Sequence, residues 1–170
     1  IEAALHKLRK SDSRDRTPRW VVLTGGEPML QIDHALIDLL YGIGYSVMVE
    51  TNGTVAIPED VDIDHITCSP KVPADELKID PYLIDDLKVL HPHPDPAMDP
   101  EQFVKWSQGN GTTRYIQPIE ASVMFSDIGH QQGVDEKVQT RVNLLTSLDY
   151  VYSHPGWRLS AQVHKFLGVE

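Results

Sequence analysis

The chain has 170 residues, of which 41% are hydrophobic and 24% are charged, a composition typical of one globular domain with a single core. Its net charge of −10 argues against a nucleic-acid-binding surface, and no apolar run reaches the roughly 18 residues that a membrane span needs. One cysteine excludes an internal disulfide, which is typical of a cytoplasmic protein.

The first predicted element is a helix over Ile1–Lys10, in which apolar residues recur at helical spacing. No capping residue precedes this helix, so we expect the chain to begin within it and to lack the first βα portion of its domain. Residues 1–170 would then form a single, incomplete domain. A polar loop over Ser11–Pro18 follows the helix.

A predicted strand over Trp20–Thr24 leads directly into Gly25, Gly26 and Glu27. Because glycine has no Cβ atom, a ligand can approach the main chain at the two glycines, and the carboxylate of Glu27 can accept a hydrogen bond from a ligand ammonium. A tight turn without a ligand is the alternative for an isolated pair of glycines. The motifs that follow favour a ligand site.

A helix is predicted from the N-cap Asp33 to about Leu40, with an apolar face made by its leucine and isoleucine residues. Three predicted strands come next along the chain. They cover Ser46–Glu50, Ile63–Cys68 and Asp86–Leu90.

Polar residues follow two of these strands. Glu50 and Asn52 provide a carboxylate and an amide, which suit the hydroxyl and carboxylate groups of a ligand. Asn52 followed by Gly53 is equally typical of a plain turn, because both residues tolerate positive φ. The next strand end carries a hydroxyl and an ammonium on either side of a proline, in the sequence Ser69, Pro70 and Lys71.

The segment Pro92–Pro100 contains four prolines and is predicted to be a surface loop without regular structure. A short helix over Glu101–Ser107 and a strand over Thr113–Gln117 follow. An amphipathic helix is predicted over Asp135–Leu148, and the residues after it are predicted to form a tail.

This alternation of helices and strands predicts an α/β fold with a mostly parallel sheet. The polar and glycine-rich motifs fall at the predicted carboxyl ends of the strands. In parallel α/β sheets and barrels, ligands bind at that edge, because the loops there vary without unpairing the sheet. The placement of the motifs therefore predicts a ligand site by itself.

Five motifs along the chain can be compared with known families: Thr24-Gly25-Gly26-Glu27-Pro28, Glu50-Thr51-Asn52-Gly53-Thr54, Cys68-Ser69-Pro70-Lys71, Tyr115-Ile116-Gln117-Pro118 and Ser160-x-Gln162-x-His164-Lys165. Together they resemble the 7-carboxy-7-deazaguanine synthase family of radical S-adenosylmethionine enzymes. The resemblance runs from about Trp20 to the C-terminus, and the closing motif is its most family-specific part. It implies a partial (β/α) barrel of the radical S-adenosylmethionine type, with the first βα portion missing.

The resemblance also implies an activity. Members of the family convert 6-carboxy-5,6,7,8-tetrahydropterin to 7-carboxy-7-deazaguanine with release of ammonia, on the route to queuosine and other deazapurines. They use S-adenosylmethionine, a 4Fe–4S cluster and magnesium. The implied partners are the small pterin substrate and a reductant such as flavodoxin or ferredoxin, and the implied assemblies include a homodimer.

By resemblance, the glycines and Glu27 hold the methionine end of S-adenosylmethionine, and the loop after Tyr115–Gln117 approaches its adenine. The implied cosubstrate contacts are Gly25, Gly26, Glu27, Glu50, Asn52, Ser69, Pro70, Lys71, Gln117, Pro118, Ile119 and Glu120. The implied contacts to the pterin are Thr24, His164 and the terminal Glu170.

The chain departs from the family in its cysteines. The family holds its cluster with three cysteines in a loop after the first strand, whereas this chain has only Cys68, which we predict to be a small buried residue and not a cluster ligand. We therefore expect this chain to be inactive alone. The alternative is a cluster-free module that binds S-adenosylmethionine or a purine without turnover. A phosphate-binding enzyme is disfavoured, because no Gly-Lys-Ser/Thr follows the glycines.

Overall fold

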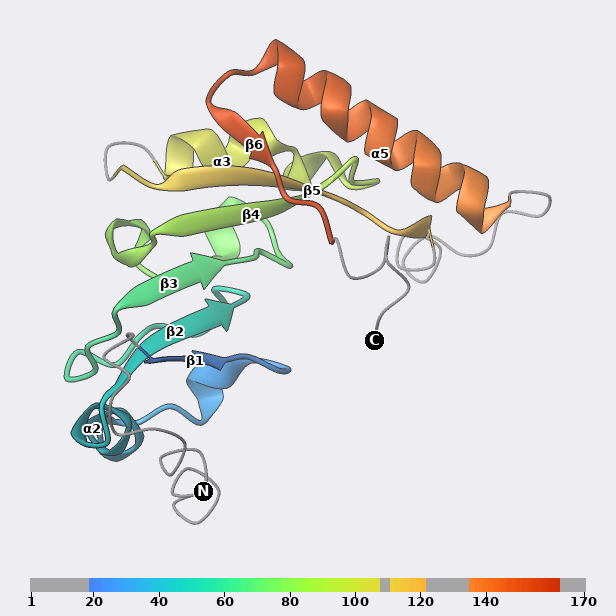
Figure 1. Ribbon diagram of the computed structural model, residues 1–170. Helices are drawn as coiled ribbons and strands as arrows, with labels where there is room; N and C mark the ends of the chain where they lie inside the picture. The colour runs from blue at the N-terminus through green and yellow to red at the C-terminus, as the bar shows by residue number, and fades with distance from the viewer. Residues whose placement is uncertain (1–18, 108–110, 122–134, 163–170) are drawn as a thin grey trace.

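The structure, a computed structural model, describes residues 19–107, 111–121 and 135–162 (Figure 1). Within these ranges six strands form one sheet, in which every neighbouring pair is parallel and the spatial order follows the order along the chain. The strands are β1 (Arg19–Leu23), β2 (Tyr45–Thr51), β3 (His65–Cys68), β4 (Asp86–His91), β5 (Thr113–Pro118) and β6 (Trp157–Leu159).

The helices of the described ranges are α2 (His34–Gly42), α3 (Pro100–Trp106) and α5 (Glu136–Ser153). Short 3-10 turns cover Pro28–Leu30, Ala74–Glu76, Pro81–Leu83 and Pro96–Met98. The α/β class and the parallel sheet predicted from the sequence are confirmed. The described sheet ends at β1 on one side and β6 on the other, as an open part of a barrel does. None of the described helices is long and apolar enough to cross a bilayer.

The helices pack against one face of the sheet. Along β2, Val47 and Val49 are fully buried on the face that α2 covers with Ile37 and Leu40. Residues of the opposite parity, such as the exposed Glu50, point to the other face. A parallel strand therefore needs apolar residues mainly where a helix covers it.

A second core cluster lies between the other half of the sheet and helices α3 and α5 (Figure 1). It contains Leu87 and Val89 of β4, Ile116 of β5 and Trp157 of β6, packed on Phe103 of α3. The side chain of Trp157 is buried in this cluster. This cluster fixes β5, β6 and α5 relative to one another, which matters for the site below.

The local signals that predicted α2 act as expected. The side chain of Asp33 accepts a hydrogen bond from the backbone N–H of Leu36 at 2.8 Å, which satisfies one of the free donors at the helix start. The same device begins α5, where Asp135 accepts from the N–H groups of Lys137 and Val138.

Three details differ from the predictions. The segment after α5 was predicted to be a tail, but its residues Trp157–Leu159 form β6, which pairs with β5. Helix α5 continues five residues beyond the predicted end at Leu148, because Tyr150 and Val151 pack into the core and no proline occurs before Pro155. The proline-rich loop contains the 3-10 turn Pro96–Met98. The predicted helix over residues 1–10 lies outside the described residues.

Candidate functional site

The carboxyl ends of the six described strands meet at one edge of the sheet. The predicted site residues between Thr24 and Glu120 all lie on strands or loops at this edge. At the usual spacing of about 4.8 Å between strands, the end of β1 lies roughly 19 Å from the end of β5 along the sheet. The edge therefore has two parts, one at β1 and β2 and one at β5 and β6.

Glu27 joins the ends of β1 and β2. Its Oε1 accepts hydrogen bonds from the hydroxyl of Thr51 at 2.7 Å and from the backbone N–H of Met29 at 3.0 Å, and its Oε2 accepts from the N–H of Asn52 at 2.8 Å. A carboxylate has about four acceptor positions, so these three donors leave about one for a ligand. Glu27 thus positions two motif loops, a role that the sequence did not reveal.

Asn52 forms the turn that was considered as an alternative to ligand binding. Its side-chain oxygen accepts from the backbone N–H of Thr54 at 2.8 Å and from the hydroxyl of Thr54 at 2.6 Å. Gly53 has φ +79°, and a Cβ there would lie 2.9 Å from Sγ of Cys68 and 2.9 Å from a methyl carbon of Leu77. The turn therefore requires glycine, and the amide NH₂ of Asn52 remains to donate at the edge.

The two glycines after β1 form an open cradle. Thr24, Gly25 and Gly26 are exposed, and a Cβ added at either glycine would meet no protein atom within 4 Å. Gly25 has φ +140°, which favours glycine, whereas Gly26 has no such restriction. Gly26 has no side chain, so the space beside its main chain is free. A ligand that contacts the backbone needs this space.

Cys68 ends β3 beneath the Asn52–Gly53 turn. Its side chain is fully buried, and burial together with the nearby carboxylate of Glu27 raises the pKa of the thiol to about 12. The predicted burial of Cys68 is confirmed, and the raised pKa of its thiol disfavours the reactive thiolate. The residues present in this chain do not fit a 4Fe–4S cluster, because one protonated, buried thiol cannot supply its ligands. The described residues also contain no group of three or more His, Cys, Asp or Glu side chains placed to hold a metal ion.

Charged groups lie beside the end of β3. Nζ of Lys88 lies 3.4 Å from Oε1 of Glu50, so the two side chains form an ion pair on the face of the sheet that the helices leave open. Desolvation and the positive charge of Lys88 both lower the pKa of Lys71. Ser69 is tied to the end of β2, since its N–H donates to the carbonyl of Thr51 at 2.8 Å.

In the β5 loop the predicted contacts separate into two groups. Ile119 lies in the core, and its N–H donates to the carbonyl of His91 while its carbonyl accepts from the buried amide of Asn143. Its side chain is buried and both of its main-chain polar groups form hydrogen bonds within the protein, so Ile119 holds the loop in position. Its contact with the cosubstrate stays a prediction. Gln117 and Glu120, on either side of Ile119, are partly exposed at the edge.

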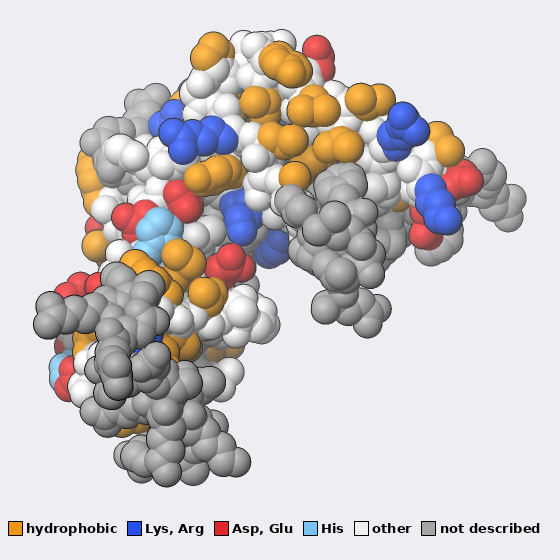
Figure 2. All heavy atoms as spheres, in the orientation of Figure 1, with side chains coloured by type: hydrophobic (Ala, Val, Ile, Leu, Met, Phe, Trp, Pro, Cys, Tyr) orange, Lys and Arg blue, Asp and Glu red, His pale blue; other side chains and the backbone are white. Residues whose placement is uncertain are grey.

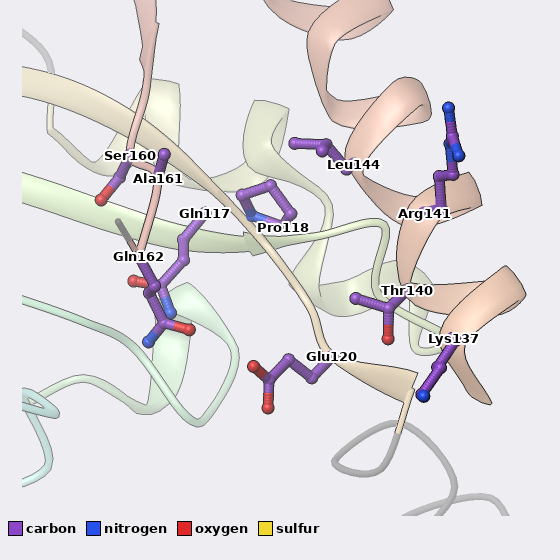
Figure 3. Close-up of a pocket in the computed structure, with 10 residues that line it drawn as sticks. All are labelled: Gln117, Pro118, Glu120, Lys137, Thr140, Arg141, Leu144, Ser160, Ala161 and Gln162. Atoms are coloured by element: carbon purple, nitrogen blue, oxygen red, sulfur yellow. The ribbon is translucent and has the colours of Figure 1, made fainter. Parts of the chain in front are cut away.

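A pocket of about 510 Å³ opens at the ends of β5 and β6, beside the first half of α5. Figure 3 shows the side chains of Gln117 and Gln162 side by side and that of Leu144 near Pro118. The other lining residues are Glu120, Lys137, Thr140, Arg141, Ser160 and Ala161.

Several of these lining residues were not predicted. Thr140 and Arg141 have no sequence signal, because they look like ordinary exposed positions of a helix. Gln162 belongs to the closing motif that the resemblance rests on, so the sequence contained the information. His164 and Glu170 lie outside the described residues.

Comparisons with known proteins test the resemblance. The chain is 37% identical over 152 residues to the 7-carboxy-7-deazaguanine synthase of Bradyrhizobium diazoefficiens, and this match covers 89% of the chain and 60% of the relative. It is 37% identical to the enzyme of the same name from Caulobacter vibrioides, with the same coverage, and 27% identical to that of Haemophilus influenzae over the full chain and 72% of the relative. The chain thus spans about 60% of the length of the first two relatives. No protein-family model matches it.

A solved structure supports the fold. The crystal structure of QueE from Escherichia coli matches 95% of the chain and 61% of its own chain, with a TM-score of 0.61 and 22% sequence identity. This match confirms the α/β architecture with an open parallel sheet. The sequence matches confirm the resemblance that the motifs predicted.

Proposed function

We propose that this relative of the 7-carboxy-7-deazaguanine synthases forms the S-adenosylmethionine-binding edge of such a synthase. The enzyme would convert 6-carboxy-5,6,7,8-tetrahydropterin to 7-carboxy-7-deazaguanine with release of ammonia. The observation that carries the proposal is the hydrogen bonding of Glu27, which holds the Gly-Gly loop of β1 against the Asn52–Gly53 turn of β2. Two motif loops are thereby fixed at the edge where parallel sheets bind ligands.

The first part of the edge suits the methionine end of the cosubstrate. The open space at Gly26 admits a ligand to the main chain. The acceptor position that Glu27 keeps can receive an ammonium, and the amide NH₂ of Asn52 can donate to a carboxylate. Ser69 and Lys71 add a hydroxyl and an ammonium from the end of β3.

The pocket at β5 and β6 suits the adenine end. Gln117 and Gln162 each carry an amide that both donates and accepts, as the edge of a purine requires (Figure 3). Pro118 and Leu144 provide an apolar wall for a flat ring. In this proposal Thr24, which is exposed beside the glycines, faces the pterin.

When bound and reductively cleaved, S-adenosylmethionine supplies the radical that removes a hydrogen atom from the substrate in this family. The residues of this chain bind and orient the cosubstrate, and the residues for the cluster do not occur among them. The burial of Cys68 therefore favours a second candidate, a module that binds S-adenosylmethionine or a purine without turnover.

Calorimetric titration with S-adenosylmethionine tests the binding edge. We expect weak binding by the unmodified chain and its loss in Gly26→Val, because a β-branched side chain fills the cradle. Gly156→Val is the matched control, since Gly156 also has open space but lies at the opposite end of its strand. Equal binding by both variants would contradict the proposal. Anaerobic reconstitution with iron and sulfide separates the two candidates, because bound cluster and turnover by the isolated chain would exclude the binding-only module.

A further inference from the structure

Lys88 is a mostly buried lysine on the face of the sheet that the described helices leave open. Its side chain is 22% exposed, and its Nζ lies 3.4 Å from Oε1 of Glu50, whose side chain is 43% exposed. A lysine rarely loses this much contact with water unless its charge is paired. Within the ranges that the structure describes, Lys88 forms no other ion pair, and Glu50 accepts no other hydrogen bond. The two groups therefore depend on each other.

The ion pair crosses a strand. Glu50 belongs to β2 and Lys88 to β4, and β3 lies between them in the sheet. Thr67 of β3 is in register with Glu50, so its side chain faces the same way, and it is only 5% exposed. Figure 2 shows basic and acidic side chains in the middle of the molecule, between the ends that carry α2 and α5. The pair thus links three strands on the open face.

Glu50 lies between the two parts of the binding edge. Leu23 is in register with Val49, so Glu50 is the neighbour of Thr24, at the start of the glycine cradle. If the methionine end binds at the cradle and the adenine end in the pocket at β5 and β6, the ribose lies between them; this step rests on the proposed function. A carboxylate has about four acceptor positions, and Lys88 occupies one. The others can accept from the two ribose hydroxyls.

A second ammonium group lies near the ion pair. Desolvation and the positive charge of Lys88 lower the pKa of Lys71, so the two ammonium groups lie close enough to repel each other. One carboxylate, that of Glu50, is thus placed near two positive charges. Without Lys88 this half-exposed side chain would be free to change rotamer, and a ligand would have to order it on binding.

We infer that Lys88 is a positioning residue, whose ammonium fixes the carboxylate of Glu50 so that it accepts hydrogen bonds from the ribose hydroxyls of S-adenosylmethionine. Lys88 acts through Glu50 and does not itself contact the ligand. Its replacement should therefore weaken only the binding of ligands that carry these hydroxyls. A merely structural role would weaken the binding of every ligand alike.

Two nucleosides test this difference: adenosine, and 2′,3′-dideoxyadenosine, which lacks both hydroxyls. Their dissociation constants are measured by titration of amide chemical shifts. The unmodified chain should bind adenosine about tenfold more tightly, because hydrogen bonds to a charged acceptor are lost with the hydroxyls. Lys88→Met keeps the apolar stem and should reduce this ratio to about twofold or less, with no change for dideoxyadenosine. Lys88→Arg keeps the positive charge and should retain the ratio.

A double variant tests whether Lys88 acts through Glu50. Glu50→Gln should reduce the ratio as Lys88→Met does, and Glu50→Gln/Lys88→Met should reduce it no further, because both changes affect the same acceptor. Lys105→Met is the matched control, since Lys105 is an exposed lysine of α3, and it should change neither dissociation constant. Circular dichroism checks that each variant is folded.

The outcomes separate this inference from the proposed function. Equal weakening of both nucleosides by Lys88→Met would overturn the inference and leave the binding edge intact. An unmodified chain that binds both nucleosides equally, a full ratio in Lys88→Met, or a further loss in the double variant would also overturn it. If neither the nucleosides nor S-adenosylmethionine bind the unmodified chain, the proposed function is refuted and the inference with it.

Discussion

Oε2 of Glu27 accepts a hydrogen bond from the backbone N–H of Asn52 at 2.8 Å, across the ends of β1 and β2. The same carboxylate accepts from the hydroxyl of Thr51, which in turn accepts from the N–H of Gly53 at 3.0 Å. The two loops that carry the most recognisable motifs are therefore one hydrogen-bonded unit. Hydrogen bonds to an ionised acceptor inside a partly buried site contribute more than neutral ones.

We expect Glu27→Gln to lower the free energy of unfolding by about 1.5–3 kcal/mol, because an amide NH₂ then faces the donor of Asn52 or Thr51. Glu50→Gln is the control: its carboxylate is exposed and pairs with Lys88 at 3.4 Å, so its loss should cost about 0–1 kcal/mol. Urea denaturation measures both. Equal losses would mean that Glu27 does not link the loops.

Gly53→Ala should destabilise the chain by about 2–4 kcal/mol. The alanine must adopt φ +79°, which side chains disfavour, and its Cβ would lie 2.9 Å from Sγ of Cys68. Gly26→Ala is the matched control, since nothing lies within 4 Å of a Cβ there, and it should change stability by less than about 1 kcal/mol. Thermal unfolding followed by circular dichroism compares them. A midpoint for Gly53→Ala equal to that of Gly26→Ala contradicts the prediction.

The stability of the chain should fall as the pH drops below 6.5, in part because of His91. Its ring lies 4.8 Å from that of Tyr150, and its Nδ1 lies 3.1 Å from Oγ of Ser147. Burial lowers the pKa of His91 from its ordinary value of 6.5, against the opposing effect of Asp99. The unfolded chain therefore binds the proton first, so the contribution of neutral His91 is present above pH 6.5 and is lost as the pH falls toward the folded pKa.

His91→Asn, which keeps a polar atom near the position of Nδ1, should reduce this slope. Urea denaturation of both proteins at several pH values from 7.5 to about 5 measures it. A variant whose stability has the same pH dependence as the unmodified chain would show that other groups control the slope.

Cys68 should resist thiol reagents in the folded chain, because it is fully buried and its thiol has a pKa raised to about 12. Its reaction with a disulfide reagent at pH 8 should become fast only in denaturant. The absorbance of the thiol that the reagent releases measures the rate of this reaction. Rapid reaction of the native chain would show that the end of β3 opens readily.

Most of the fold was predictable because its strands have strong local signals. Apolar runs closed by turn residues located β1 to β5, and Asp33 located the start of α2. Strand β6 was missed because its three residues include the exposed Arg158, which gives no apolar run. A strand this short forms because β5 supplies its hydrogen bonds, and a single sequence does not show that neighbour.

The site was less predictable than the fold: its position followed from the sequence, but the contacts within it did not. The motif positions at the strand ends follow from the parallel topology, so Gly26, Asn52 and Ser69 lie at one edge as expected. Two of the three donors to Glu27, on Thr51 and Asn52, lie 24 and 25 residues away along the chain, and local patterns do not encode such contacts. The burial of Ile119 depends likewise on Asn143, a polar residue that a helical pattern would place outside the core.

The central claim is that S-adenosylmethionine binds along the carboxyl edge of the sheet. Amide chemical shifts of the isotope-labelled chain, titrated with S-adenosylmethionine, test it most directly. We expect the largest changes in residues 24–27, 51–54, 69–71 and 117–120, because these segments form that edge. Changes confined to the opposite edge, around Gly44 and Gly111, or no change at millimolar S-adenosylmethionine, would contradict the claim.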